Sequence, residues 1–400
     1  MAQPIHLNGT TLEGGGQLLR LATCLSSLTT TPIHITSIRG NRSGGGGLKT
    51  QHLTSLQWLT NACNARTSGL ALKSTEIQFV PAANSPSTVG NMDERGGEVS
   101  INQSTPGSVN LVFQAILPYI LFSGRGKSGE PVRVRITGGT NVSNSPSCDY
   151  VEQVLLPMLA LIGIPAIEAK VHARGWSQGP TTLGAVTYTV TPLVRKLPAF
   201  RLTERGDVES VRATIIAPKA YEQQFRDELD VMFEKRESRF FGARDPDVEV
   251  TFEDSHHEKR YYFLLVATTT HGIKLGRDWL YSHAVRAGKI ETVISSLVRK
   301  VSDDLLSEIE HGGCVDEYLR DQLIVFQALA KGKSEVYGGK RKDALLEPSL
   351  HARTAHWVAK EVIGVDFDKE GACEGIGFGE DERHEEVEIE LAESLHKLEV

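Results

Sequence analysis

Cysteine is scarce in this sequence, and no cysteine pattern suggests a cross-link or a metal site. The 400 residues contain no Cys-x-x-Cys pair and no Cys/His pair at a metal-binding spacing. The five cysteines lie far apart, at Cys24, Cys63, Cys148, Cys314 and Cys373. This distribution excludes a disulfide framework and a zinc knuckle, and it favours a reducing compartment.

Long apolar segments are also missing. The N-terminus lacks the basic and apolar regions of a signal peptide, which predicts a protein that is not secreted. The longest nearly apolar run, Leu111–Phe122, is interrupted by Gln114 and Pro118 and is too short to span a bilayer. We therefore expect no membrane partner and a location in the nucleus or the cytoplasm.

The net charge shows only a small excess of one sign. It is −7, in a chain that is 40% hydrophobic and 23% charged, which excludes a disordered or fibrous protein. Residues Gly379 to Val400 hold nine of the acidic and two of the basic residues, so the rest of the chain is neutral. We predict that residues 379–400 form a solvated acidic tail. The charge therefore does not argue against a nucleic-acid partner.

Two common motifs for nucleotide chemistry are absent. The Gly-Lys-Ser sequences that end at Ser128 and Ser334 both lack the first glycine of a P-loop. No Lys-x-Asp-Gly motif provides the lysine nucleophile of nucleotidyl-transferring ligases. His351 and His356 are five residues apart, which separates them widely around a helix and is a poor arrangement for a shared metal.

What the sequence does contain is a pattern of helix, strand, polar loop and helix that occurs three times. The first copy comprises Gln17–Ser27, Pro32–Ile38, Arg39–Gly47 and Thr50–Ala65. The second comprises Ser108–Phe122, Pro131–Thr137, Gly138–Ser147 and Tyr150–Ile162. The third comprises Glu317–Ala330, Ser334–Tyr337, Gly338–Ser349 and His351–Ile363. Each loop precedes a helix, where free backbone N–H groups and the helix dipole favour anions.

A stretch of different character separates the second and third copies. It holds strand-like runs at AVTYTVTPL, DVEVTFED and RYYFLLVATTT around a charged helix, Ala220–Lys235. We therefore predict an α/β (α+β) fold with a large domain of three repeated units, at residues 1–186 and 285–378. A smaller inserted α/β domain is expected at residues 187–284.

Arginines and glycines gather in the first copy. Glu13-Gly14-Gly15-Gly16-Gln17 is followed by Arg20, then by Arg39, Arg42, Gly44–Gly47 and Gln51-His52. Glycines allow the backbone to approach a phosphate, and arginines donate paired hydrogen bonds to its oxygens. A solvated surface loop would explain any one of these arginines, but three beside two glycine runs favour an anion site.

Residues 13–53, from EGGGQ to QHL, closely resemble the N-terminal signature of the RNA 3′-terminal phosphate cyclase family. The resemblance continues in GGTNVSNSPSCDY, in EYLRDQL (Glu317–Leu323) and in PSLHARTA (Pro348–Ala355). It implies an ATP-dependent ligase that converts an RNA 3′-phosphate to a 2′,3′-cyclic phosphodiester. The reaction would pass through an adenylyl-histidine and an RNA adenylate and release AMP and diphosphate. A nuclear location and no obligate protein partner are also expected.

The resemblance also assigns roles to single residues. It implies that His351 is the nucleophile and that Arg20, Arg39 and Arg42 clamp the phosphates. It places the ATP or AMP against Gln51, His52, Gln114, Tyr318, Asp321 and Gln322, and it makes Glu13 the carboxylate for Mg²⁺ or Mn²⁺. Without the resemblance, His351 would be read as an ordinary helix-start residue, Tyr318 as a half-buried aromatic and Glu13 as a cap of the glycine turn.

The sequence departs from the family beside the expected adenine site, where GGTNVSNSPS lacks the usual Ala-Pro pair. Two other interpretations remain open. One is a non-catalytic cyclase-like RNA-binding protein of ribosome assembly, and the other is an enolpyruvyl transferase of similar repeated architecture. Retention of EGGGQ, Arg39, Arg42 and His351 favours the cyclase.

Overall fold

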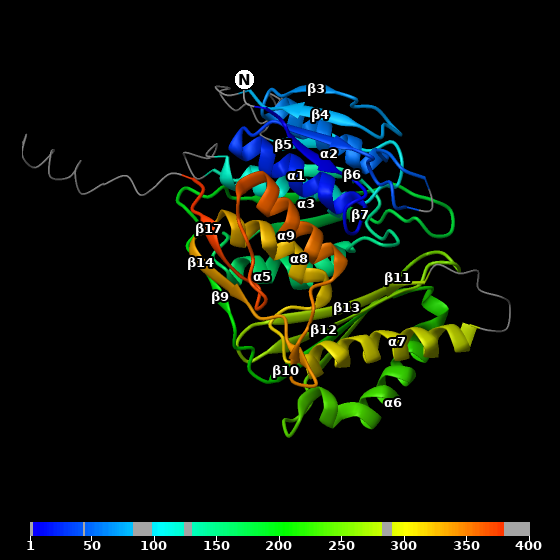
Figure 1. Ribbon diagram of the computed structural model, residues 1–400. Helices are drawn as coiled ribbons and strands as arrows, with labels where there is room; N and C mark the ends of the chain where they lie inside the picture. The colour runs from blue at the N-terminus through cyan, green and yellow to red at the C-terminus, as the bar shows by residue number, and fades with distance from the viewer. Residues whose placement is uncertain (1–2, 43–44, 83–97, 124–129, 282–289, 380–400) are drawn as a thin grey trace, which may run out of the picture.

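The computed structural model describes residues 3–42, 45–82, 98–123, 130–281 and 290–379 (Figure 1). The acidic tail from residue 380 onward and part of the first glycine loop, residues 43–44, lie outside this range. No helix within the described residues is long and apolar enough to cross a membrane. The fold is α/β, as predicted.

The first two repeat units have the same sheet topology. In the first, β1 (Ile5–Asn8), β2 (Ile33–Thr36), β4 (Ile77–Val80) and β3 (Arg66–Ser68) pair in that order. In the second, β5 (Glu98–Asn102), β6 (Val132–Gly138), β8 (Gly184–Val190) and β7 (Glu168–Ala173) pair in that order. The first pair of each sheet is parallel and the other two pairs are antiparallel. This agreement confirms the repeat.

The third unit takes its first strand from a distant part of the chain. Its central strand, β14 (Lys331–Val336), pairs in parallel with β9 (Arg201–Leu202) and antiparallel with β17 (Ala372–Ile376). Since β9 occupies the position that β1 and β5 occupy in the other units, the insertion lies between β9 and the first helix of the third unit, α8 (Glu317–Leu329).

The strand pairing therefore corrects both predicted boundaries of the inserted domain. Residue 187 falls inside β8, which belongs to the second unit because it pairs with β6 and β7. Residue 284 precedes α7 (Ile290–His311), a helix that was not predicted. Its residues were assigned to the large domain, but it packs on β12 and β13 of the insertion. The run AVTYTVTPL was assigned to the insertion because its alternation carries no information about which sheet it joins.

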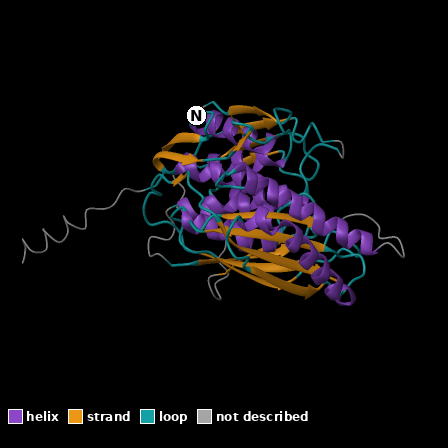
Figure 2. Cartoon of the chain, turned by 90° about the horizontal axis from the view of Figure 1, so that it is seen from below, coloured by secondary structure: helices purple, strands orange, loops and turns teal. Residues whose placement is uncertain are grey.

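The inserted domain is a four-stranded sheet with two helices on one face (Figures 1 and 2). The strand order is β11 (Val248–Asp254), β10 (Val208–Ala217), β12 (Tyr262–Thr269) and β13 (Lys274–Leu280). The central strand β12 is a continuous apolar run and is almost wholly buried, whereas the edge strand β11 alternates between half-buried and exposed positions. Helices α6 (Glu222–Phe241) and α7 cover the sheet.

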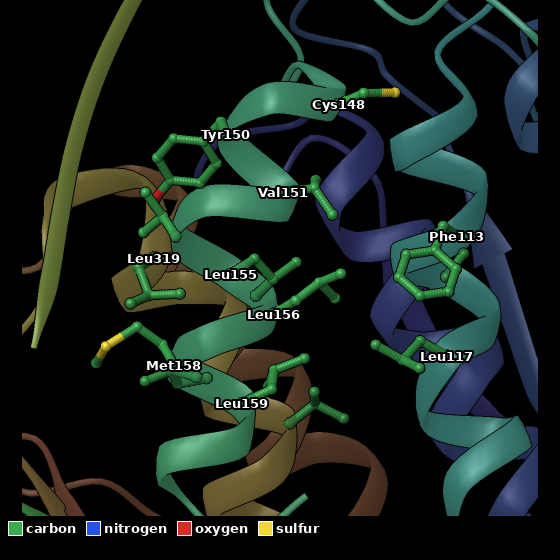
Figure 3. Close-up of a cluster of buried hydrophobic side chains, with 14 of the residues drawn as sticks. Phe113, Leu117, Cys148, Tyr150, Val151, Leu155, Leu156, Met158, Leu159 and Leu319 are labelled. Atoms are coloured by element: carbon green, nitrogen blue, oxygen red, sulfur yellow. The ribbon is translucent and has the colours of Figure 1, made fainter. Parts of the chain in front are cut away.

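Helices from all three units pack together between the sheets. They are α1 (Gly16–Thr29), α2 (Thr50–Ala62), α3 (Val109–Phe122), α8 and α9 (Leu350–Ile363). The second helix of the second unit runs from α4 (Cys148–Tyr150) through a π-helical turn (Val151–Leu155) to α5 (Leu156–Leu161). Figure 3 shows its side chains clustering with those of α3 and α8. The cavity described next lies at one end of this helical core.

Candidate active site

A cavity of about 570 Å³ opens where the three units meet the inserted domain. This volume is within the range of roughly 300–1,000 Å³ that is typical of small-molecule sites. Six of the predicted site residues line it: Arg20, Gln114, Tyr318, Asp321, Gln322 and His351. They come from four helices, α1, α3, α8 and α9, that are far apart in the sequence.

His351 lies in the first turn of α9. Ser349 caps this helix, because its Oγ accepts a hydrogen bond of 3.2 Å from the backbone N–H of Ala352. The imidazole is about half exposed, with 51% of its side-chain surface accessible. Burial, followed by the charges of Arg20 and Arg42, lowers the pKa of His351. The ring is therefore neutral at pH 7 and has a nitrogen lone pair available for reaction.

Glu13 lies beside this histidine and fits a role as a metal ligand. Its carboxylate is 6% exposed, is ion-paired with Arg42 and has its Oε1 3.9 Å from the His351 Nε2. Neither carboxylate oxygen accepts a well-aligned hydrogen bond within the described part of the chain. The backbone N–H of Glu13 donates to Thr354 Oγ1 at 3.2 Å, which ties the EGGG turn to α9. Mg²⁺ commonly binds through one or two carboxylates together with substrate phosphates.

The glycines of this turn allow close approach of charged side chains. A Cβ atom on Gly16 would lie 2.5 Å from His52 Nε2 and 3.0 Å from an Arg20 Nη1 atom. His52 is buried, and burial together with the charges of Arg20, Arg39 and Lys49 lowers its pKa to about 3. Its Nδ1 accepts a hydrogen bond from the Lys49 backbone N–H, so His52 is a neutral residue behind the cavity wall.

Arg20 and Asp321 both line the cavity, and the charge of each acts on the other. Burial lowers the pKa of Arg20 to about 10, although the charge of Asp321 opposes this. Burial raises the pKa of Asp321 to about 7, although the charge of Arg20 opposes that shift. Arg20 remains a cation at pH 7, and it donates a 2.6 Å hydrogen bond to Gln17 Oε1. The Arg20 guanidinium is therefore available to pair with an anion in the cavity.

The remaining predicted site residues divide between the cavity and the structure around it. Gln114 donates to Gln322 Oε1, which joins α3 to α8 at the cavity wall. Gln51 does not line the cavity. Its Oε1 accepts a hydrogen bond of 3.2 Å from the backbone N–H of Ser108. Arg39 is buried, and its guanidinium donates to the carbonyl oxygens of Gly45 and Gly47. In this structure, Arg39 therefore binds the backbone of residues 45–47.

We expect Arg39→Ala to destabilise the fold, because it leaves two loop carbonyls without their donor. The free energy of unfolding should fall by about 1–3 kcal/mol, measured by urea denaturation. The exposed Arg353→Ala is the matched control, with an expected change within about 0.5 kcal/mol. Equal effects of the two substitutions would contradict the structural role of Arg39.

Part of the cavity wall is aromatic. Tyr318 is 40% exposed, packs edge-on against Tyr150 at 5.9 Å between ring centroids, and has the Arg277 guanidinium 4.6 Å from its ring centroid. Tyr150, Tyr262, Asp278 and Trp279 also line the cavity. Sequence reasoning missed all four. β13 was not recognised as a strand, and nothing in the sequence indicates that the insertion folds back over the large domain.

The lining residues together define what the site can hold. They include a cation, a neutral imidazole and aromatic rings that can stack on a flat ligand. No cluster of three or more His, Cys, Asp or Glu side chains within the described residues could bind a metal alone. The arrangement suits a ligand with a phosphate group at one end and a planar ring at the other.

Comparison with known proteins gives a consistent answer. A family model described as RNA 3′-terminal phosphate cyclase matches residues 11–369. A Pyrococcus furiosus protein named RNA 3′-terminal phosphate cyclase is 31% identical over 376 residues, covering 93% of this chain and 96% of that protein. Proteins of the same name from Drosophila melanogaster (29% identical, covering 93% and 97%) and Thermococcus gammatolerans (32% identical, covering 92% and 94%) are similar to it along nearly their whole length. The chain therefore belongs to the RNA 3′-terminal phosphate cyclase family.

Proposed function

We propose that this protein is an ATP-dependent ligase that converts the 3′-terminal phosphate of RNA into a 2′,3′-cyclic phosphodiester. AMP and diphosphate are the other products. The observation that carries the proposal is the neutral, half-exposed imidazole of His351 in a cavity that is also lined by Arg20 and by aromatic rings. The names of the relatives support the RNA substrate.

The first step is attack by a neutral His351 ring nitrogen on the α-phosphorus of ATP. A P–N bond forms, the bond from the α-phosphorus to the bridging oxygen breaks, and diphosphate leaves. A proton is lost from the other ring nitrogen, so the product is a neutral adenylyl-imidazole. Arg20 and Arg42, whose positive charges lower the pKa of His351, would stabilise the negative charge on the transferring group.

Two further transfers complete the reaction. An oxygen of the RNA 3′-phosphate attacks the same phosphorus and displaces the imidazole, which takes up a proton. The neighbouring 2′-OH then attacks the RNA phosphorus, loses its proton and expels AMP, which closes the cyclic diester. Because His351 is in the first turn of α9 and its side chain is half exposed, an RNA end can reach it from solvent.

The nucleotide would lie along the cavity with its phosphate at His351 and Arg20 and its base against Tyr318. Gln114, Asp321 and Gln322 also line the cavity and would contact the sugar or the base. A divalent ion, Mg²⁺ or Mn²⁺, would supply neutralisation of the triphosphate charge, and Glu13 is the residue that would hold it. Gln51, His52 and Arg39 would act indirectly, through their hydrogen bonds to Ser108, Lys49 and the carbonyls of Gly45 and Gly47.

The test uses an RNA oligonucleotide with a radiolabelled 3′-terminal phosphate, incubated with the full chain, ATP and Mg²⁺. We expect the label to become resistant to phosphatase, with AMP formed in equal amount. A matched oligonucleotide whose last nucleotide is 2′-deoxy lacks the second nucleophile, so it should become adenylylated and not cyclised. Failure of the RNA to gain phosphatase resistance, with ATP and either metal, would overturn the proposed function.

A further inference from the structure

The inserted domain supplies one wall of the cavity. Tyr262 on β12 and Asp278 and Trp279 on β13 line it together with Tyr150 and Tyr318 of the large domain. The insertion is therefore positioned to contact the aromatic part of a bound ligand. Within this wall, Asp278 is the charged side chain, and the function proposed above gives it no role.

Asp278 differs from the other two carboxylates that line the cavity. Glu317 accepts a 3.1 Å hydrogen bond from Arg277, and the positive charge of Arg20 acts to lower the pKa of Asp321. Asp278 instead accepts a 3.0 Å hydrogen bond from the hydroxyl of Tyr262. That hydroxyl lies 2.5 Å from Ser147 Oγ, so a neutral relay connects Asp278 to the loop that precedes α4. These two hydroxyls hold the Asp278 carboxylate in place, and neither of them carries a positive charge that would neutralise it.

The ionisation of Asp278 decides what it can bind. Burial raises the pKa of Asp278 to about 6, while the hydroxyls of Tyr262 and Ser147 oppose the shift and the charges of Asp149 and Asp316 add to it. At pH 7.5 the group is therefore mostly a carboxylate, which can accept hydrogen bonds and cannot donate them.

The cavity lining also includes an amide donor without a partner among the described residues. Asn141 is 1% exposed and lines the cavity, and its Nδ2 has no hydrogen-bond partner within the described residues. Its Oδ1 already accepts from Thr140 Oγ1 at 2.7 Å. A buried polar group of this kind costs stability unless a ligand satisfies it. The cavity wall thus offers one acceptor, on Asp278, and one free donor, on Asn141, to a polar planar ring.

We propose that Asp278 determines which nucleobase the cavity accepts, by taking a hydrogen bond from the exocyclic amino group of adenine. Hypoxanthine and guanine carry an acceptor oxygen at the same ring position, and a carboxylate repels it. The unpaired Asn141 amide complements a ring nitrogen of the base. This inference rests on the proposed function, in which the phosphate lies at His351 and the base at Tyr318. It makes the inserted domain the source of base selectivity.

The test measures binding of AMP and IMP to the full chain by titration calorimetry at pH 7.5. The two nucleotides differ at the 6-position and the adjoining ring nitrogen, and neither can adenylylate the protein. We expect AMP to bind about tenfold or more tightly than IMP, because a buried carboxylate left facing a carbonyl costs at least one lost hydrogen bond. In Asp278→Asn the ratio should fall to near one, since an amide can donate to the carbonyl of IMP.

Two further variants separate selectivity from general damage. Tyr262→Phe retains the ring and removes the hydroxyl that orients Asp278, so the AMP/IMP ratio should fall part of the way. Glu317→Gln changes a carboxylate on the same cavity that is paired with Arg277, and it should retain the wild-type ratio. A merely structural role of Asp278 would weaken both nucleotides equally and leave the ratio unchanged.

The outcomes distinguish this inference from the function on which it rests. Equal binding of AMP and IMP to the wild type, an unchanged ratio in Asp278→Asn, or no binding of AMP would each overturn the role of Asp278. If RNA is cyclised and the ratio does not respond to Asp278, only this inference fails. If the ratio responds and no RNA is cyclised, the base-selective site stands and the proposed reaction fails.

Discussion

Replacement of His351 by alanine is expected to abolish formation of a covalent adduct between the protein and the AMP part of ATP. The imidazole supplies the only bond to phosphorus in the proposed first step, so no residual adduct should remain. The measurement is transfer of label from ATP carrying ³²P at the α-position, in the presence of Mg²⁺, followed by denaturing electrophoresis. The wild-type adduct should be labile in acid and stable in alkali, as a phosphoramidate is.

The fold should tolerate this substitution. His351 is in the first turn of α9 with half of its side chain exposed, and the helix cap at Ser349 does not involve it. We therefore expect the free energy of unfolding to change by less than about 0.5 kcal/mol. Loss of the adduct in a folded protein would then be attributable to the imidazole.

His356 provides a matched control on the same helix. Its ring stacks on Phe367 at 4.2 Å between centroids, and burial lowers its pKa to about 4. His356→Ala should lower stability through lost packing and should leave the adduct in place. An adduct that survives in His351→Ala, or that disappears in His356→Ala alone, would contradict the assignment of the nucleophile.

The sequence predicted the repeated part of the fold well, because each copy carries its own helical periodicity and its own loop. The helix that begins beside His351 was expected at His351–Ile363 and is observed at Leu350–Ile363. The six cavity residues on α1, α3, α8 and α9 could be named because family resemblance identifies single positions.

The insertion could not be predicted to the same extent. Its boundary depends on β9, two residues that pair with β14 more than a hundred residues later, and a two-residue strand has no periodicity. The contribution of Asp278 and Trp279 to the cavity could not be predicted either. It depends on how β13 packs against the large domain, and that packing involves segments that are distant in the sequence. Arg39 illustrates another limit of prediction from sequence. Its residue type favours a contact with phosphate, but in the structure its guanidinium donates hydrogen bonds to carbonyl oxygens of its own loop.

Asp316 is where the docking of the insertion can be tested. This side chain is 1% exposed and makes contacts with three parts of the molecule. Its Oδ2 accepts from the backbone N–H of Gly276 on β13 at 2.8 Å, and its Oδ1 accepts from the hydroxyl of Tyr150 at 2.7 Å. As the N-cap of α8, it also accepts from the backbone N–H groups of the two residues that follow Glu317.

We expect Asp316→Ala to lower the free energy of unfolding by about 3–5 kcal/mol, because it removes a helix cap and leaves a buried N–H and a buried hydroxyl without acceptors. That is a large share of the roughly 5–15 kcal/mol that stabilises a typical domain. Urea denaturation would measure the loss. Tyr318, in the first turn of α8, should also lose its fixed position, so that AMP binding weakens where the variant remains folded.

Ser349→Ala is the matched control for this prediction. Ser349 caps α9 through one hydrogen bond to the Ala352 N–H, and its hydroxyl forms no hydrogen bond with the described residues of the insertion, so its loss should cost only about 1 kcal/mol. The difference between the two variants measures what Asp316 contributes beyond capping, through Gly276 and Tyr150. If Asp316→Ala proved no more destabilising than Ser349→Ala, the insertion would not be held to the large domain through this carboxylate, and the wall that carries Asp278 would need another anchor.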